Sequence, residues 1–177
     1  MFALIAANCN VANAQKIGTV LFQEIMLVLP ETDSVQSQIQ KKAQELEADL
    51  EAMRVEFNNK ASDFETNKEN YTPAISEQKQ KELIEIQTRY QNYTQAAQSD
   101  IESIQMKLTQ PILKKVADMI QTVSKENGLL MVVDLTQGNN IMYVDEENSM
   151  DITPIVKERL GVDRDAVPNY AALGYTE

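Results

Sequence analysis

In the middle of the chain, apolar residues recur among polar ones with the spacing of long amphipathic helices. Between Glu31 and Thr72 there is no Gly or Pro, and apolar side chains recur at steps of three and four residues. This spacing places them in one narrow stripe, which is the pattern of a coiled-coil seam. With Asp33 as its expected N-cap, the helix would be about 55 Å long, at about 1.5 Å per residue. The stripe consists of Val35, Ile39, Ala43, Leu46, Leu50, Met53, Phe57, Ala61 and Phe64.

A second helix of the same pattern is predicted after a short break at residues 71–73. Pro73 disfavours a helical Thr72 and suits the first turn of a new helix, with Thr72 as its cap. Two long helices joined by so short a break should fold back into an antiparallel hairpin. The second helix is expected to continue past Pro111 with a kink there, and to end at Asn127 and Gly128. Its stripe consists of Leu83, Ile86, Tyr90, Tyr93, Ala97, Ile101, Ile104 and Leu108.

Short apolar runs on both sides of the hairpin predict β-strands. Residues 17–22 are apolar and partly β-branched, and residues 129–135 form a continuous apolar run of strand length. Residues 138–140 (Gly-Asn-Asn) favour a turn, after which residues 141–144 predict another strand.

The remaining segments predict short helices and a tail. Residues 24–29 are consistent with either a short helix or a turn, which Pro30 would end. Asp151 should cap a short helix that ends at Gly161. Residues 163–177 contain turn residues and little periodicity, which predicts a flexible tail.

Together these elements predict an α+β fold, mostly α, in which a long antiparallel helical hairpin projects from a small β-strand-containing body. Residues 33–111 would form the hairpin arm, and residues 15–32 and 112–162 the body. Three short strands do not form a stable sheet around a private core, so each chain is expected to bury them against its own base helices or against copies of itself. Three chains could close a shared barrel-like body, whose interface would also remove exposed strand edges. The residues expected at that interface are Ile17, Val20, Leu130, Val132, Ile141 and Tyr143.

The first 14 residues, MFALIAANCNVANA, resemble the second half of a secretory signal peptide. They combine an apolar stretch with a small-x-small pattern that ends at Ala14, where cleavage is expected. The alternative is an ordinary flexible N-terminus. Cys9 is the single cysteine, so cleavage would leave the mature chain without a thiol. No stretch approaches the roughly 20 apolar residues of a membrane span, which predicts an exported protein without an anchor.

Composition argues against several classes of function. The formal net charge is −11, whereas nucleic-acid binding needs a basic surface. The chain has no His, so it lacks the usual general base and the commonest metal ligand. Carboxylate pairs such as Glu45 with Asp49 are typical of a solvated helix face, and no phosphate loop, zinc pattern or nucleophile elbow is present. We therefore expect a protein that is not an enzyme and uses no cofactor or metal.

The order of elements resembles the Skp (OmpH-like) family of periplasmic chaperones over about residues 16–162. The resemblance rests on the opening KIGTVLFQEIMLVLPE, the Gln/Glu/Lys-rich hairpin, the junction LTQPILKKV, the strand block ENGLLMVVDLTQGNNIMYVD and the closing MDITPIVKERLG. It implies a homotrimer whose helical hairpins surround a cavity. In that cavity the family holds unfolded outer-membrane proteins without using nucleotide.

The charge of this chain departs from the family pattern. The best-known members are basic, whereas residues 60–82 here contain four Lys against five Asp and Glu, so the hairpin tip has no basic cluster. Lipopolysaccharide binding is therefore not carried over. The alternative to a chaperone is a non-catalytic coiled-coil structural or adaptor protein of the cell envelope, which would bind one folded partner.

The apolar stripes could form the seam between the two helices or a surface for unfolded client proteins. The seam is favoured, because each helix needs a partner for its apolar face. Bulky side chains at the edges of the seam and near the tip are expected to contact clients, since Met adapts to varied partners and Tyr is amphipathic. These residues are Met53, Phe57, Phe64, Tyr71, Ile75, Tyr90 and Tyr93. The sequence thus predicts an ATP-independent periplasmic holdase whose partners are unfolded outer-membrane proteins and other copies of itself.

Overall fold

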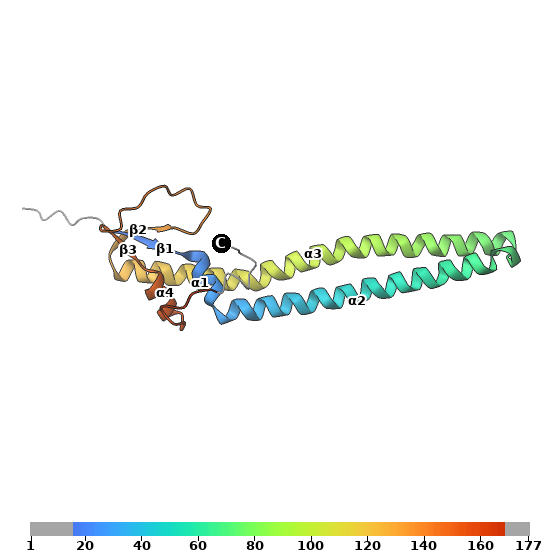
Figure 1. The fold of residues 1–177 in the computed structure, drawn as a ribbon, viewed down its shortest axis with the longest axis horizontal. Helices are drawn as coiled ribbons and strands as arrows, with labels where there is room; N and C mark the ends of the chain where they lie inside the picture. Colours follow the sequence, from blue (N-terminus) through green and yellow to red (C-terminus); the bar gives the residue numbers. More distant parts are fainter. Residues whose placement is uncertain (1–15, 169–177) are drawn as a thin grey trace, which may run out of the picture. The chain divides into compact units, whose positions relative to one another are not determined.

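The chain divides into two compact units in the computed structural model, which describes residues 16–168 (Figure 1). The arm comprises residues 30–112, and the body comprises residues 16–29 and 113–168. The predicted fold class, mostly helical with a long helical hairpin and a small β-containing body, is confirmed. The predicted signal segment, residues 1–14 with Cys9, lies outside the described residues.

The arm is an antiparallel pair of helices (Figure 1). Helix α2 (Pro30–Asn67) is followed by the short helix η1 (Lys68–Asn70), and α3 (Pro73–Glu126) then returns beside α2. Ion pairs between residues three or four positions apart support both helices, for example Lys42 with Glu45 and Lys81 with Glu77. The predicted apolar seam is confirmed at its centre, where Leu46, Ile86 and Ala97 are buried.

Helix α2 begins four residues earlier than predicted. Pro30 is its first residue, rather than the end of the preceding segment. A proline fits there because the first N–H groups of a helix have no partner within the helix and φ is already close to the helical value. Asp33 therefore lies within the first turn instead of at the N-cap, and that expectation was wrong.

The start and end of α3 agree with the prediction. Pro73 is its first residue, and the Thr72 hydroxyl oxygen accepts a hydrogen bond from the Ile75 amide at 3.4 Å. The helix continues through Pro111, and Gly128 follows its end with a φ of +63° that suits glycine. The kink expected at Pro111 stays a prediction.

The body contains a three-stranded parallel sheet in the order β2–β1–β3. The central strand is β1 (Lys16–Val20), flanked by β2 (Leu129–Asp134) and β3 (Ser149–Asp151). Gly18 lies opposite Val132 on one side and Met150 on the other. A Cβ atom at Gly18 would lie 2.6 Å from the Leu129 Cδ1 atom, so the missing side chain permits this close packing.

The predicted strand at residues 141–144 was wrong. The turn at Gly138 forms, but the Ile141 amide then donates to the Asn139 carbonyl at 2.8 Å, which directs the chain away from β2. Residues 135–148 form a loop, and the third strand is β3 on the opposite side of β1. The backbone of Thr19 anchors it there, since the Thr19 carbonyl accepts a hydrogen bond from the Ile152 amide at 2.9 Å.

Two short helices complete the body. Residues 22–28 form α1 (Phe22–Val28), which settles the choice between helix and turn in favour of a helix. Helix α4 (Thr153–Arg159) follows Asp151, whose carboxylate accepts a hydrogen bond from the Thr153 amide at 2.9 Å. The core draws its fully buried side chains from α1 and the residue after it, the last turns of α3, and the start of α4. These are Ile25, Leu29, Val116, Val123, Ile152 and Val156.

A buried ion pair joins α1 to α4. The Lys157 side chain is 4% exposed, and its ammonium group pairs with the Glu24 carboxylate and donates to the Ala166 carbonyl at 2.7 Å. This contact holds part of the predicted tail, and Pro168 is also buried. The remainder of that segment, residues 169–177, lies outside the described residues.

Candidate functional site

One edge of the arm's helical seam opens into an apolar hollow. Met53 and Phe57 of α2 and Tyr90 of α3 line a cavity of about 290 Å³, with Ile86 at its floor. Ile86 is 4% exposed, whereas Tyr90 is 37% exposed, so the hollow reaches from the seam to solvent. Three residues predicted to contact clients, Met53, Phe57 and Tyr90, are therefore brought together.

Two polar residues form the rest of the lining. Arg54 of α2 donates to both carboxylate oxygens of Glu51 on its own helix, at 2.7 and 2.8 Å. This hydrogen bond and ion pair raise the pKa of Arg54 and lower that of Glu51. Gln87 of α3 completes the lining. The side chains at this edge thus leave apolar surface accessible to solvent.

The opposite edge of the seam is closed by polar bridges between α2 and α3. The Tyr93 hydroxyl donates to the Asp49 carboxylate at 2.6 Å, which raises the pKa of Tyr93. Lys60 pairs with Glu82 at 3.0 Å, a hydrogen bond that raises the pKa of Lys60 and lowers that of Glu82. Tyr93, which was predicted to contact clients, uses its hydroxyl in this cross-helix bridge, and its contact with clients stays a prediction.

A third cross-helix bridge lies between these two along the same edge, where Arg89 pairs with Glu56. On ideal helices, the bridging residues of α2 lie three, four or seven positions apart, and so do those of α3. They therefore share one side of the seam, and the hollow lies on the other side.

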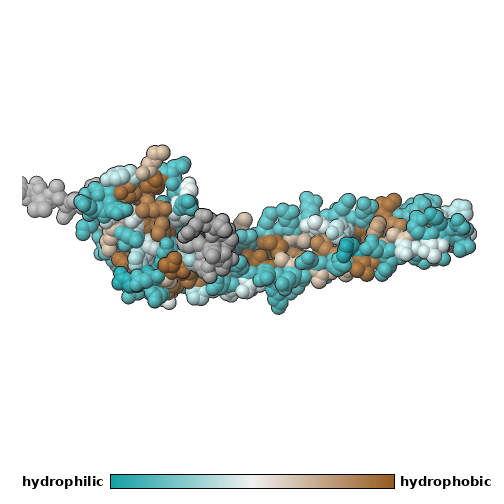
Figure 2. All heavy atoms as spheres, viewed as in Figure 1, coloured by the Kyte–Doolittle hydropathy of each residue, from teal (hydrophilic) through white to brown (hydrophobic). Residues whose placement is uncertain are grey.

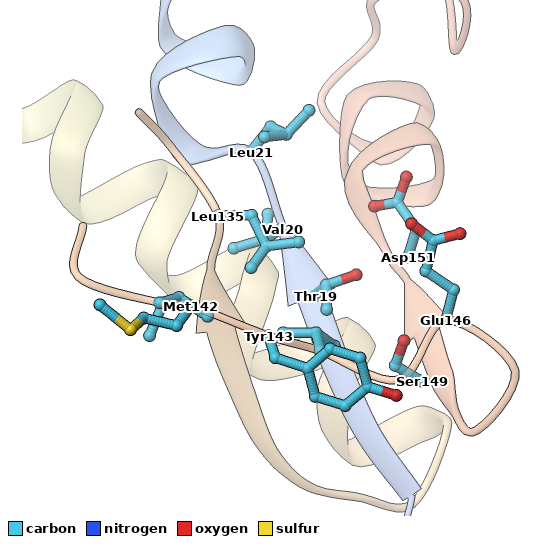
Figure 3. A pocket seen from close by; sticks show the side chains of 11 residues that line it. Thr19, Val20, Leu21, Leu135, Met142, Tyr143, Glu146, Ser149 and Asp151 are labelled. Atoms are coloured by element: carbon cyan, nitrogen blue, oxygen red, sulfur yellow. The ribbon is translucent and has the colours of Figure 1, made fainter. Parts of the chain in front are cut away.

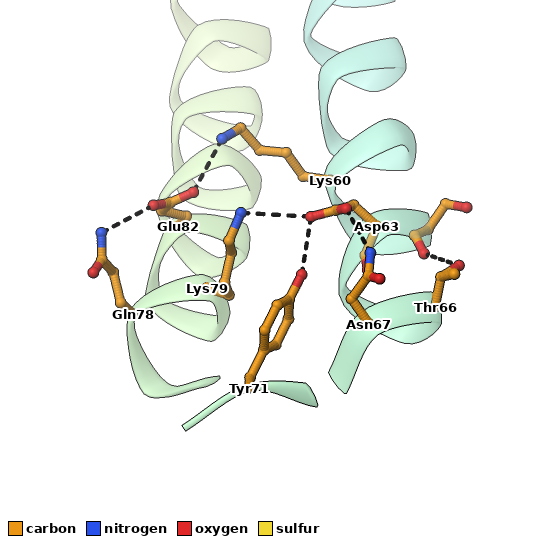
Figure 4. A network of polar contacts seen from close by, with 9 residues as sticks. Lys60, Asp63, Thr66, Asn67, Tyr71, Gln78, Lys79 and Glu82 are labelled. Carbon is orange, nitrogen blue, oxygen red and sulfur yellow. Dashed lines mark hydrogen bonds and ion pairs between the residues drawn. The ribbon is translucent and has the colours of Figure 1, made fainter. Parts of the chain in front are cut away.

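A carboxylate organises the tip of the arm (Figure 4). Asp63 accepts hydrogen bonds from the Tyr71 hydroxyl at 3.1 Å and the Asn67 amide at 2.9 Å, and pairs with Lys79 at 3.5 Å. The Tyr71 hydroxyl, with Lys79 and Asn67, holds the pKa of Asp63 below its ordinary value. The tip is thereby tied together from both helices and from the connection between them.

Three further residues predicted to contact clients lie at this tip. The rings of Phe64 and Tyr71 stack in a tilted arrangement, with centroids 6.1 Å apart. Ile75, in the first turn of α3, is exposed. Their contact with clients stays a prediction, and they are separate from the hollow at Met53, Phe57 and Tyr90.

Apolar surface elsewhere on the arm is scattered. Figure 2 shows separate hydrophobic patches divided by hydrophilic residues, rather than one continuous stripe, on the face in view. Val55 and Met106 are exposed singly on the two helices, and Ile84 lines a separate hollow on another face of α3, together with Tyr93 and Ala96. Isolated exposed apolar residues are common on protein surfaces and need no functional explanation.

A second hollow lies in the body, beneath the loop of residues 135–148 (Figure 3). The loop crosses the sheet face at β1, and a cavity of about 460 Å³ separates them. Ile141 and Tyr143 from the loop and Val20 from β1 line it, which brings together three predicted interface residues. Tyr143 is 80% exposed, whereas Val20 is 3% exposed and leaves little surface for another chain.

The other predicted interface residues lie along the sheet itself. Leu130 is exposed on β2, one of the two outer strands of the sheet, and Val132 on the same strand is half-buried. Both line a groove of about 410 Å³ between β2 and the last turns of α3. Ile17 of β1 is half-buried. The body therefore presents apolar surface at the β2 edge and on the loop.

Sequence reasoning missed Arg54 and Gln87 as parts of the hollow. A signal was present, because Arg54 precedes Phe57 by three positions and Gln87 precedes Tyr90 by three, which places each pair on one helix face. Within residues 16–168, no cluster of three or more Cys, Asp or Glu residues could hold a metal ion. None of the helices in the same range is long and apolar enough to cross a membrane.

Comparison with known proteins agrees with this architecture. The family model described as "Outer membrane protein (OmpH-like)" matches residues 16–160. A protein of Pectobacterium atrosepticum named "Chaperone protein Skp" is 23% identical over 157 residues, covering 89% of this chain and 92% of its own. A protein of the same name from Yersinia enterocolitica is 23% identical over 156 residues, covering 88% of this chain and 92% of its own.

The fold has a counterpart among solved structures. A crystal structure of a Caulobacter crescentus CB15 protein described as OmpH-like superposes with a TM-score of 0.68. It shares 19% sequence identity and covers 82% of this chain and 83% of that one, so it shows similarity of fold alone. Because the family model spans most of its length, the chain belongs to the OmpH-like outer membrane protein family.

Proposed function

We propose that the protein is an ATP-independent holdase that binds unfolded outer-membrane proteins in the periplasm and prevents their aggregation. The observation that carries the proposal is the hollow at Met53, Phe57 and Tyr90, where the arm's apolar seam is open to solvent. Unfolded proteins expose apolar side chains that would otherwise aggregate. The hollow offers such side chains a place to be shielded from water.

Membership of the OmpH-like family supports a role as a chaperone of outer membrane proteins. The arm suits a holdase because many weak apolar contacts need no fixed client sequence. Each buried side chain contributes about 1–2 kcal/mol, partly offset by the cost of ordering the client. Release needs no nucleotide if the client next folds into a membrane, because that step removes the unfolded form.

We also propose that the body assembles three copies of the chain. The apolar side chains of Leu130 at the β2 edge and of Tyr143 on the loop support this, since both are largely exposed in a single chain. An open strand edge readily pairs with another chain, so a second copy would cover it. Static light scattering on the full chain measures the assembly directly, and a monomer at micromolar concentration would refute it.

The holdase is tested by diluting a urea-unfolded outer-membrane β-barrel into buffer with increasing amounts of the protein. Without ATP, light scattering by the aggregating barrel should fall to its baseline near one trimer per client. Unchanged scattering over all ratios would refute the proposal. Capture of one folded protein from an envelope extract, with no effect on the unfolded barrel, would favour the structural or adaptor protein instead.

A further inference from the structure

The arm carries a surplus of negative charge. Residues 30–112 contain nine Lys and Arg against fifteen Asp and Glu. Each of the seven Lys and Arg residues between positions 42 and 89 has a carboxylate partner within the arm. The cations of this region are thus already neutralised, and the charge left to attract a binding partner is negative.

The surplus of negative charge is also found on the helix face beside the hollow. Glu47, Glu51 and Arg54 follow one another at steps of four and three residues, so they share the helix face next to Phe57. Arg54 is occupied by both carboxylate oxygens of Glu51, and Glu47 is exposed. The surplus charge on this face of α2, which runs from the hollow to Glu47 about two turns before Arg54, is therefore that of a carboxylate.

We propose that the hollow binds a large apolar side chain from unfolded segments that carry Lys or Arg on either side of it. The proposal rests on the proposed holdase function and names the class of client segment that the arm selects. A cationic flank is attracted by the surplus carboxylates, whereas an acidic flank is repelled. The cavity of about 290 Å³ has room for a Leu or Phe side chain.

Three synthetic unstructured peptides test this selectivity. They share one Leu- and Phe-containing centre and differ only in having Lys, Gln or Glu flanks, and fluorescence anisotropy measures their binding to the full chain. At about 50 mM salt, the Lys-flanked peptide should bind at least about fivefold more tightly than the Glu-flanked one. The ratio should fall below about twofold at 0.5 M salt, where charges are screened. Equal or stronger binding of the Glu-flanked peptide would overturn the proposal.

Paired variants test whether the hollow is the binding site. Tyr90→Ser removes the exposed ring from the hollow, and its control Ile84→Ser removes an exposed apolar side chain from another face of α3. Tyr90→Ser should weaken binding of the Lys-flanked peptide about three- to tenfold. Ile84→Ser should change it by less than about twofold. Similar effects of both variants would place binding elsewhere and refute the site.

A second pair of matched variants tests the charge beside the hollow. Glu47→Lys and Glu85→Lys change the net charge equally, but Glu85 lines another face of α3. Glu47→Lys should reduce the preference for the Lys-flanked peptide more than Glu85→Lys does, with helix content by circular dichroism unchanged in both. If aggregation of the unfolded barrel is suppressed but no flank is preferred, only this inference fails. If suppression is also absent, the holdase function itself fails.

Discussion

Replacement of Lys157 by methionine should destabilise the body strongly. The Lys157 side chain is 4% exposed and its partner Glu24 is 18% exposed, so the change leaves a largely buried carboxylate without its cation. It also removes the hydrogen bond to the Ala166 carbonyl. Breaking a buried pair by removing one partner typically costs about 3–5 kcal/mol, and the residual exposure of Glu24 reduces this to about 2–4 kcal/mol.

Urea unfolding followed by circular dichroism measures this effect. All variants are compared at one protein concentration, because assembly would make stability depend on concentration. The matched control is Arg159→Met, which breaks the exposed pair with Glu126, and it should cost less than about 0.5 kcal/mol. The double variant Glu24→Met/Lys157→Met should recover to within about 1 kcal/mol of the natural sequence, because it leaves no buried charge behind.

Two results would contradict this reasoning. If Lys157→Met costs no more than Arg159→Met, the pair does not hold α1 against α4. If the loss in unfolding free energy of the double variant equals the sum of the losses of the two single variants, then Lys157 and Glu24 act independently. In that case the buried carboxylate is not the source of the instability.

Three further outcomes are expected. Ile86→Ala should cost about 2–4 kcal/mol in urea unfolding, because it empties the floor of the seam, and a loss below about 1 kcal/mol would contradict the burial. Burial alone would raise the pKa of Asp134, but hydrogen bonds from Thr136 and the Phe22 amide outweigh it and leave the pKa below the ordinary 3.8. The stability that Asp134 contributes is therefore present above pH 3.8 and is lost as pH falls through the lower folded-state pKa. The difference in unfolding temperature between the natural sequence and Asp134→Asn should accordingly narrow below pH 3.8, as measured by thermal unfolding at a series of pH values. Asp63→Asn should accelerate protease nicking at residues 71–73, since it loosens the tip, and an unchanged cleavage rate would argue against the tip network.

The helical arm could be predicted from the sequence because its information is local. A period of 3.6 residues defines both helices, the lack of Gly and Pro from Glu31 to Thr72 supports the first, and Thr72 with Pro73 defines the turn between them. The start of α2 was misplaced because Pro30 can either end one segment or begin the next. Leu29, the residue before Pro30, is buried in the body core, and the local sequence does not show this packing.

The body was harder to predict because its pairings join distant segments. The turn at Gly138 predicted a hairpin, but β1 accepts β3 from more than 120 residues later in the chain. Nothing local in the apolar residues 141–144 distinguishes an exposed loop from a strand. The hollow of the arm could not be predicted for a related reason. The periodicity identifies the seam, but it does not show which edge of the seam is closed by polar bridges and which stays open.

The most direct test of the account is to map where an unfolded client touches the arm. A photo-crosslinking phenylalanine derivative is placed at position 90, at the hollow, and in a second variant at Asn92, which lies on another face of α3. Each protein is irradiated with a urea-diluted outer-membrane β-barrel. The account predicts strong crosslinks from position 90 and weak ones from position 92. Equal crosslinking at the two positions, or none at position 90 while aggregation is still suppressed, would contradict it.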